Sequence, residues 1–140
     1  MKIMIDTNVI IDIYQNRMPF VDNSIKILKL SESRKVAGYI TASAITDIYY
    51  ILNRYIKDHE QMMMLVKKLL TSVTLVDVLA KDVTDSFDLV MEDFEDALLA
   101  QCAKRLKTDY IVTRNPKDFM NSPVPPIKPD DFLNKFFGSV

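Results

Sequence analysis

The chain has 140 residues, of which 49% are hydrophobic and 26% are charged. This length and balance indicate one folded domain spanning residues 1–140, with enough apolar surface for a core that needs no disulfides. The formal net charge of −1 argues against a protein coated in positive charge for tight nucleic-acid binding, although a local basic patch could still engage a polyanion transiently.

Cysteine and histidine are almost absent, which excludes two classes of site. The single cysteine, Cys102, cannot form an internal disulfide and is interpreted as buried packing. The single histidine, His59, excludes a His-rich zinc site. No segment has the pattern of a signal peptide or of a membrane span, so we expect a cytoplasmic protein with no membrane contact.

Segments typical of strands and helices alternate along the chain. In chain order the sequence predicts strand 2–6, helix 7–14, helix 24–34, strand 36–41, a helix from the N-cap Ser43 to about Ile56, helix 60–70, strand 73–78, helix 81–90, helix 93–106, strand 109–113, a short strand near Ile127 and a terminal helix through Phe136. Alternating strands and helices imply right-handed crossovers. We therefore predict an α/β fold with a mostly parallel sheet of four to five strands covered on both faces.

Acidic and amide residues from four segments fall near the carboxyl ends of the predicted strands. Asp6 ends the first strand, and Asp47 lies in the first turn of the helix after the second strand. Asp96 lies in the first turn of the helix before the fourth strand, and Asn115 and Asp118 follow that strand. Because ligands of such sheets gather at the carboxyl edge, we expect these side chains to share one rim.

A cluster of carboxylates is tolerable when divalent cations neutralise the mutual repulsion. Oxygen ligands suit Mg²⁺ or Mn²⁺, and two such ions about 4 Å apart can activate water and stabilise the leaving oxygen of a phosphodiester. The pattern therefore favours a metal-dependent hydrolase of phosphodiesters. The acids that could take part in such a site are Asp6, Asp47, Asp96 and Asp118.

Each of these residues also has an ordinary structural explanation. Asp6 could cap the helix that follows it. Asp47 and Asp96 could favour the dipole of their own helices, and Asn115 to Asp118 fits a common turn. Only their expected convergence on one rim favours a site over these separate uses.

Three blocks of sequence together resemble PIN-domain nucleases, including the VapC-like toxins of bacterial toxin–antitoxin systems. The first block is Met4 to Asp12 (MIDTNVIID), the second is Asp93 to Ala103 (DFEDALLAQCA) and the third is Asp109 to Phe119 (DYIVTRNPKDF). The resemblance extends in order over essentially the whole chain. It implies a three-layer α/β/α sandwich, divalent metal ions and endonucleolytic cleavage of RNA.

The resemblance also implies roles for individual residues. By position, Asp6 would be the central metal ligand and Asp96 the third acid, while Asp47 stands where the family usually has glutamate. Together with Asp118 these would be the catalytic acids, and Asp6, Asp96 and Asp118 would bind the metal. Asn8 and Thr113 would be supporting polar residues. The family further implies homodimers, and a small antitoxin partner if this protein is a toxin.

The chain departs from the family pattern after the fourth strand. Many relatives have aspartate where this chain has Asn115, and the nearest acid is Asp118, so either residue could complete the site. Basic residues near the rim, Arg17, Arg114 and Lys117, are expected to hold RNA phosphates without reading bases.

The resulting hypothesis is a Mg²⁺- or Mn²⁺-dependent endoribonuclease that acts as the toxin of a toxin–antitoxin pair. The missing acid at position 115 motivates an alternative, a PIN-fold interaction module with weak or no activity. A phosphohydrolase with an aspartyl nucleophile is disfavoured, because Asn8 occupies the position where that chemistry commonly has a second acid.

Overall fold

The computed structural model describes residues 1–138 and is built on a parallel sheet of five strands in the order β3-β2-β1-β4-β5. The strands are β1 (Lys2–Ile5), β2 (Ala37–Thr41), β3 (Thr74–Val76), β4 (Tyr110–Val112) and β5 (Pro126–Ile127). The α-helices of this range are α1 (Thr7–Tyr14), α2 (Val21–Glu32), α3 (Ala42–Asn53), α4 (His59–Ser72), α5 (Ala80–Ser86), α6 (Phe94–Arg105) and α7 (Pro129–Phe137). The predicted α/β fold with a parallel sheet is confirmed.

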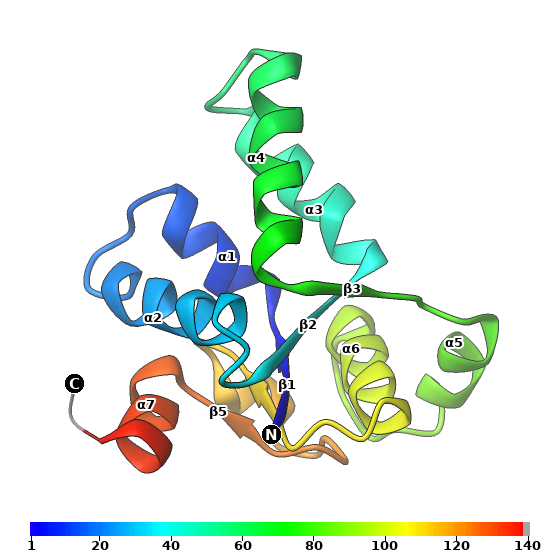
Figure 1. Ribbon diagram of the computed structural model, residues 1–140. Coiled ribbons are helices and arrows are strands. Elements are labelled where there is room, and N and C mark those ends of the chain that lie inside the picture. The colour runs from blue at the N-terminus through cyan, green and yellow to red at the C-terminus, as the bar shows by residue number, and fades with distance from the viewer. Residues whose placement is uncertain (139–140) are drawn as a thin grey trace.

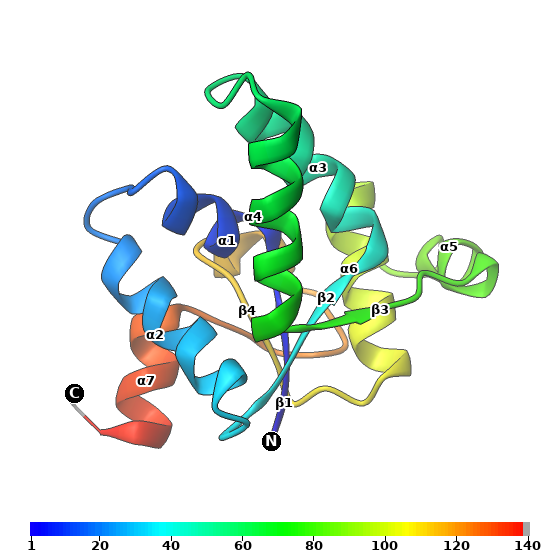
Figure 2. The ribbon, with the colours of Figure 1, turned by 45° about the horizontal axis from the view of Figure 1, so that its top comes forward.

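Helices cover both faces of the sheet, with α1, α2 and α7 on one side and α5 and α6 on the other (Figure 1, Figure 2). Successive side chains of a strand point to opposite faces, so β1 contributes to both cores. Ile3 and Ile5 join the cluster under α1 to α4 and α7, whereas Met4 joins the cluster under α6. Cys102 is fully buried in this second cluster, as predicted.

Several predicted helix boundaries are wrong by a few residues. Helix α2 begins at Val21 rather than Ser24, and α5 ends at Ser86 rather than Val90. Ser43 is not an N-cap, because α3 begins at Ala42 after Thr41. Asp47 therefore lies in the second turn of α3 and not in the first. Neither Phe20 nor Thr41 makes a side-chain capping hydrogen bond as the N-cap residue. Helices α2 and α3 therefore lack the local start signal by which a helix N-terminus is predicted from sequence.

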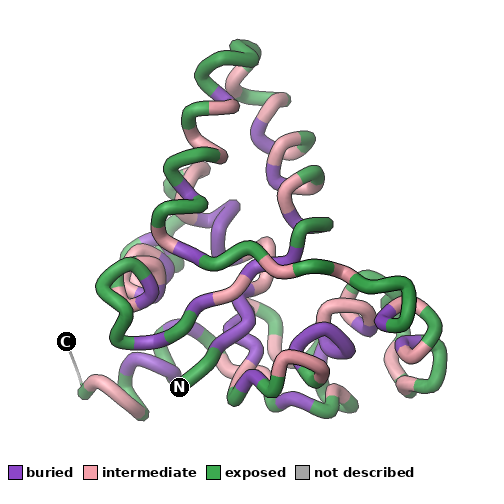
Figure 3. Tube along the Cα trace, turned by 45° about the vertical axis from the view of Figure 1, so that its right-hand side comes forward, coloured by how far each residue is buried: buried purple, intermediate pink, exposed green. Residues whose placement is uncertain are grey.

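Helices α3 and α4 pack against each other and extend away from the sheet as a hairpin (Figure 1). Buried residues are concentrated on β1, β2 and β4, and exposed residues prevail toward the tip of this hairpin (Figure 3). No helix within residues 1–138 is long and apolar enough to cross a membrane.

The order of the strands reverses at β1, which is central. From β1 the chain proceeds outward through β2 and β3, then crosses back to build β4 and β5 on the other side. The carboxyl ends of β1 and β4 are in register, with Ile5 opposite Val112. Parallel sheets bind ligands at such a reversal, so Asp6 and Thr113 emerge at the position where a site is expected.

The close approach of α2 to β2 depends on a glycine. A Cβ atom added at Gly38 would lie 2.8 Å from Ser31 Cβ, which belongs to a buried residue of α2. We predict that Gly38→Ala lowers the free energy of unfolding by about 1–3 kcal/mol, as overpacking does. Urea unfolding measures this change, and Ala37→Ser at the exposed neighbouring position should alter stability by less than about 0.5 kcal/mol. Equal effects of the two substitutions would contradict the steric argument.

Candidate functional site

Asp6 is positioned by a strand far away in sequence. It occupies the N-cap position of α1, but its side chain makes no capping hydrogen bond. Its Oδ2 atom instead accepts a hydrogen bond of 2.9 Å from the hydroxyl of Thr113, which follows β4 and is fully buried. The simple capping explanation for Asp6 is therefore wrong, because its carboxylate is directed toward the end of β4.

The same threonine hydroxyl accepts two further hydrogen bonds. Asn8 Nδ2 donates to it at 3.4 Å, and the backbone N–H of Asn115 donates to it at 3.1 Å. The Asn8 side chain also accepts from the backbone N–H of Arg114 at 3.3 Å. This network ties the first turn of α1 to the chain leaving β4, which fixes the direction of the Asp6 carboxylate.

Asp96 lies in the first turn of α6, as predicted, and its backbone N–H donates to the N-cap Asp93 at 3.0 Å. Burial, followed by the negative charges of Asp93, Asp6 and Asp118, raises the pKa of Asp96 to about 7. Burial also raises the pKa of Asp6, the hydrogen bond from Thr113 opposes this, and the charge of Asp118 adds to it. Asp6, Asp96 and Asp118 thus form one electrostatically coupled cluster.

Two adjoining clefts contain the predicted acids. Asp6, Asp47 and Asp96 line the same cleft of about 580 Å³, with α3 and α6 as its walls. Asp96 also borders a cleft of about 300 Å³ together with Lys117 and Asp118. Residues 6, 47 and 96 therefore line one cavity and do not lie on separate surfaces.

The donor set suits a hard divalent cation, since carboxylate oxygens are the ligands that Mg²⁺ and Mn²⁺ prefer. Burial, and after it the neighbouring negative charges, raise the pKa of Asp96, and a bound cation would stabilise its charged form. Within residues 1–138, however, no three acidic, histidine or cysteine side chains already converge closely enough to hold an ion. The charge and the oxygen ligands of these acidic residues therefore fit a metal ion, but their side chains are not already arranged around one position.

Asn115 and Asp118 point to different parts of the rim. Asp118 interacts electrostatically with both Asp6 and Asp96 and shares a cleft with Asp96. Asn115 instead lines a separate cleft with Arg114. Of the two residues that sequence analysis leaves open, Asp118 is the one coupled to the other acids.

Two of the three predicted RNA-binding cations already pair with an acid. Arg114 Nη1 lies 2.7 Å from Asp12 Oδ1, and Arg17 Nε lies 3.7 Å from the same oxygen. Arg17 also donates to the side chain of Gln15 at 3.0 Å. Lys117 is exposed beside Asp96 and Asp118.

Asp12, for which no role was predicted, is 1% exposed and pairs with both arginines on this side of the rim. Burial raises its pKa, and the positive charges of Arg114 and Arg17 oppose that shift. A signal was present in the sequence: Asp12 interrupts an otherwise apolar run from Val9 to Ile13. A buried acid of that kind requires a cationic partner.

A second buried ion pair holds α5 against α6 and was also not predicted. Arg105 Nε lies 2.9 Å from Asp82 Oδ1, and its Nη2 donates to the backbone oxygen of Asp77 at 2.7 Å. This pair fixes the helix that carries Asp96. No local pattern connects Asp82 to Arg105 in the sequence.

Comparisons with known proteins agree with this architecture. The sequence matches the PIN domain family over residues 2–117. The fold is similar to VapBC2 from Rickettsia felis bound to a promoter DNA fragment, with a TM-score of 0.72 and 20% identity over 91% of this chain and 98% of that chain. It is also similar to VapBC-1 from nontypeable Haemophilus influenzae, with a TM-score of 0.68 and 17% identity over 92% of this chain and 98% of that chain.

A third similar structure is VapC20 from Mycobacterium tuberculosis, which is described as a sarcin-ricin loop cleaving toxin. Its TM-score is 0.60 and its identity is 15%, over 78% of this chain and 86% of that chain. The search of curated protein sequences gives no significant match. At these low sequence identities, the similar structures support the fold alone. The family match is a match of the sequence itself, and it covers most of the chain. With its five-stranded parallel sheet and that match over residues 2–117, this chain belongs to the PIN-domain family.

Proposed function

We propose that this PIN-domain protein is a metal-dependent endoribonuclease. The observation that carries the proposal is the coupling of Asp6, Asp96 and Asp118 at the point where the strand order reverses. Asp47 adds a carboxylate from α3 to the same cleft. Carboxylates that lie close together in a cleft destabilise the folded protein unless a cation neutralises them.

Each residue has a distinct role in the proposed reaction. Asp6, Asp96 and Asp118 would hold Mg²⁺ or Mn²⁺, and Asp47 would complete the acidic wall. When bound, the ions would supply Lewis-acid stabilisation of charge and activation of water for attack at phosphorus. Thr113 holds the Asp6 carboxylate in place through its 2.9 Å hydrogen bond. Lys117, exposed beside Asp96, would contact a phosphate of the substrate.

The substrate and partners are proposed from the family and from similar structures. VapC20 is described as a toxin that cleaves the sarcin-ricin loop, and the Klebsiella pneumoniae match, with a TM-score of 0.64, is a toxin–antitoxin complex. We therefore propose RNA as the substrate, an antitoxin protein as a partner and a homodimer as the assembly. We also propose Arg17 and Arg114 as further contacts to the RNA, with Arg114 keeping its ion pair to Asp12.

A PIN-fold interaction module without useful activity is the second candidate. Two observations favour it: Asn115 stands where many relatives have an acid, and no preformed metal cage occurs within residues 1–138. The two candidates differ in whether the acidic cluster binds metal and cleaves RNA.

Cleavage of RNA tests the leading proposal directly. We predict that Asp6→Asn lowers the rate of RNA cleavage in Mg²⁺ or Mn²⁺ by about 100-fold or more, because several kcal/mol of charge stabilisation correspond to such a factor. Gel analysis of cleavage by purified wild type and variant measures the change. Asp88→Asn replaces an exposed aspartate outside the site and should cleave as the wild type does. Equal cleavage by the wild type and Asp6→Asn would exclude the proposed mechanism.

Calorimetric titration with Mn²⁺ separates the enzyme from the interaction module. We predict binding by the wild type that is lost in Asp96→Asn and weakened about 10-fold or more in Asp118→Asn. Asn115→Asp should leave affinity the same or raise it, because it adds a carboxylate near the rim. Absence of any Mn²⁺ binding by the wild type at millimolar metal would support the module instead.

The raised pKa of Asp96 predicts a pH dependence of stability in the presence of a chelator. Between the ordinary value of 3.8 and the folded value of about 7, the folded state binds more protons than the unfolded state. The free energy of unfolding therefore falls as the pH rises through this window. Below the window the Asp96 carboxyl is protonated in both states, so it adds no pH dependence there. We predict that Asp96→Asn reduces the fall in stability between about pH 5 and about pH 8.

Urea unfolding at several pH values measures this slope. The control Asp88→Asn should retain the slope of the wild type. If Asp96→Asn and the wild type lose the same stability across the window, the crowded-carboxylate explanation is wrong.

A further inference from the structure

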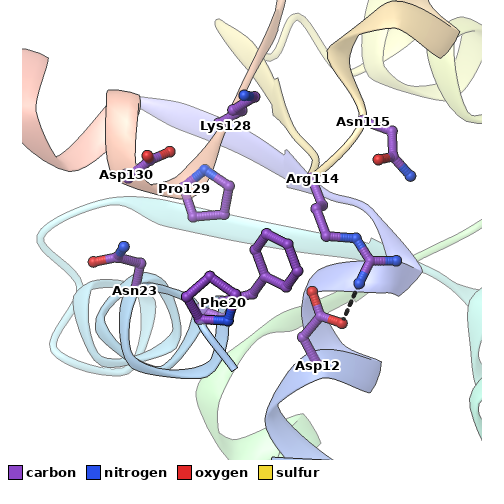
Figure 4. A pocket seen from close by; sticks show the side chains of 10 residues that line it. Asp12, Phe20, Asn23, Arg114, Asn115, Lys128, Pro129 and Asp130 are labelled. Carbon is purple, nitrogen blue, oxygen red and sulfur yellow. Dashed lines mark hydrogen bonds and ion pairs between the residues drawn. The ribbon is translucent and has the colours of Figure 1, made fainter. Parts of the chain in front are cut away.

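A larger cleft of about 640 Å³ lies on the other side of the end of β4 from the acidic cluster. It is formed by the start of α2, the segment after β4 and the start of α7 (Figure 4). The catalytic acids Asp6, Asp47, Asp96 and Asp118 do not line it. The proposed reaction therefore leaves this cleft without a function.

One wall of the cleft combines an aromatic ring with a guanidinium group. Phe20 is 37% exposed, and Arg114 Cζ lies 5.1 Å from the centre of its ring. Figure 4 shows Phe20, Pro129 and Arg114 around the cleft, with Arg114 joined to Asp12 by its ion pair. Because the Asp12 carboxylate is buried, this pair keeps the guanidinium in place. Aromatic rings and guanidinium planes are the surfaces on which unpaired nucleobases stack.

The remaining lining supplies hydrogen-bonding groups. Asn23 and Asn115 carry amides, which can both donate to and accept from the edge of a base. Ser24 also belongs to this wall, and its Oγ is the buried side-chain polar atom of residues 1–138 that has no hydrogen-bond partner. Buried hydroxyl groups are almost always paired, so this one indicates a partner that the protein itself does not supply.

The charges of the cleft favour a base over a phosphate. Arg114 is neutralised by Asp12, and Lys128 shares the lining with Asp130. A flat apolar surface with amides and nearly balanced charge suits an uncharged, planar, polar ligand. A strong anion site would instead show an excess of cations without nearby acids.

Hydrogen bonds connect this cleft to the acidic cluster. The backbone N–H of Asn115 donates to Thr113 at 3.1 Å, and Thr113 donates to Asp6 at 2.9 Å. We propose that the cleft binds one unpaired nucleobase of the RNA whose phosphate lies at the acids, and so contributes to the choice of cleavage position. The identity of the ligand as part of an RNA chain rests on the proposed function.

Nuclear magnetic resonance on the full-length, ¹⁵N-labelled protein in a chelator tests this inference without requiring cleavage. The probes are the four nucleoside 5′-monophosphates and ribose 5-phosphate, which lacks a base. We expect at least one nucleotide to shift the backbone amides of Phe20, Asn23 and Asn115, while ribose 5-phosphate leaves them unchanged.

Variants identify the contacts. Phe20→Leu should weaken nucleotide binding about 10-fold, whereas Phe20→Tyr retains the stacking surface and should bind as the wild type does. Ser24→Ala should weaken binding without lowering the free energy of unfolding, because it removes an unpaired hydroxyl. Tyr55→Ala removes an exposed aromatic ring outside the cleft and is the matched control.

Three results would overturn the inference. Equal shifts with ribose 5-phosphate would identify a phosphate site. Shifts confined to the acidic cleft would show that the base binds elsewhere. No response to any probe would show that the cleft does not bind nucleotides and would favour a protein segment as its ligand. Nucleotide binding here by a protein that does not cleave RNA would refute the proposed function and keep the base site. RNA cleavage by a protein that binds no nucleotide in this cleft would support the proposed function and refute the base site.

Discussion

The hydrogen bond from Thr113 to Asp6 joins residues that are 107 positions apart, and the rest of the site is arranged around it. It forms because β1 and β4 are parallel neighbours in register, so that the residues following Ile5 and Val112 emerge side by side. Asn8 and Asn115 bond to the same hydroxyl from either side. One buried threonine therefore connects the acidic cleft to the cleft that contains Phe20.

The two clefts differ in whether their acidic residues are paired with a cation. On the acidic side, Asp6 and Asp96 are half-buried with no ion pair to a basic residue of 1–138, and the pKa of each is raised. On the other side, the buried Asp12 is neutralised by Arg114 at 2.7 Å. Unpaired acids are suited to bind something positive, whereas a paired acid is suited to hold a neighbour in place. The first arrangement is typical of a functional site and the second of a rigid support.

Membership of the PIN-domain family rests on the sequence match, and the similar VapC structures share the fold at 15–20% identity. Family likeness therefore does not decide activity by itself. Asn115 is an example, because it stands where many relatives have an acid and lines the cleft that contains Phe20. Asp118, three residues later, is the acid coupled to Asp6 and Asp96. The details of this rim depend on the turn after β4, which the family pattern does not fix.

The sequence by itself determined the kinds of elements, their order and the parallel sheet, because hydrophobic periodicity and chain alternation are local properties. It also placed Asp6 after β1 and Asp96 in the first turn of α6, since both positions follow from a single element. Starts of α2 and α3 were displaced because no side-chain cap marks them. Only the tertiary structure decided that Arg114 pairs with Asp12, that Asp118 rather than Asn115 is coupled to the acids, and that Ser24 lies unpaired in a cleft. Contacts of this kind depend on strand register and on how distant helices pack, and a local pattern contains no information about either.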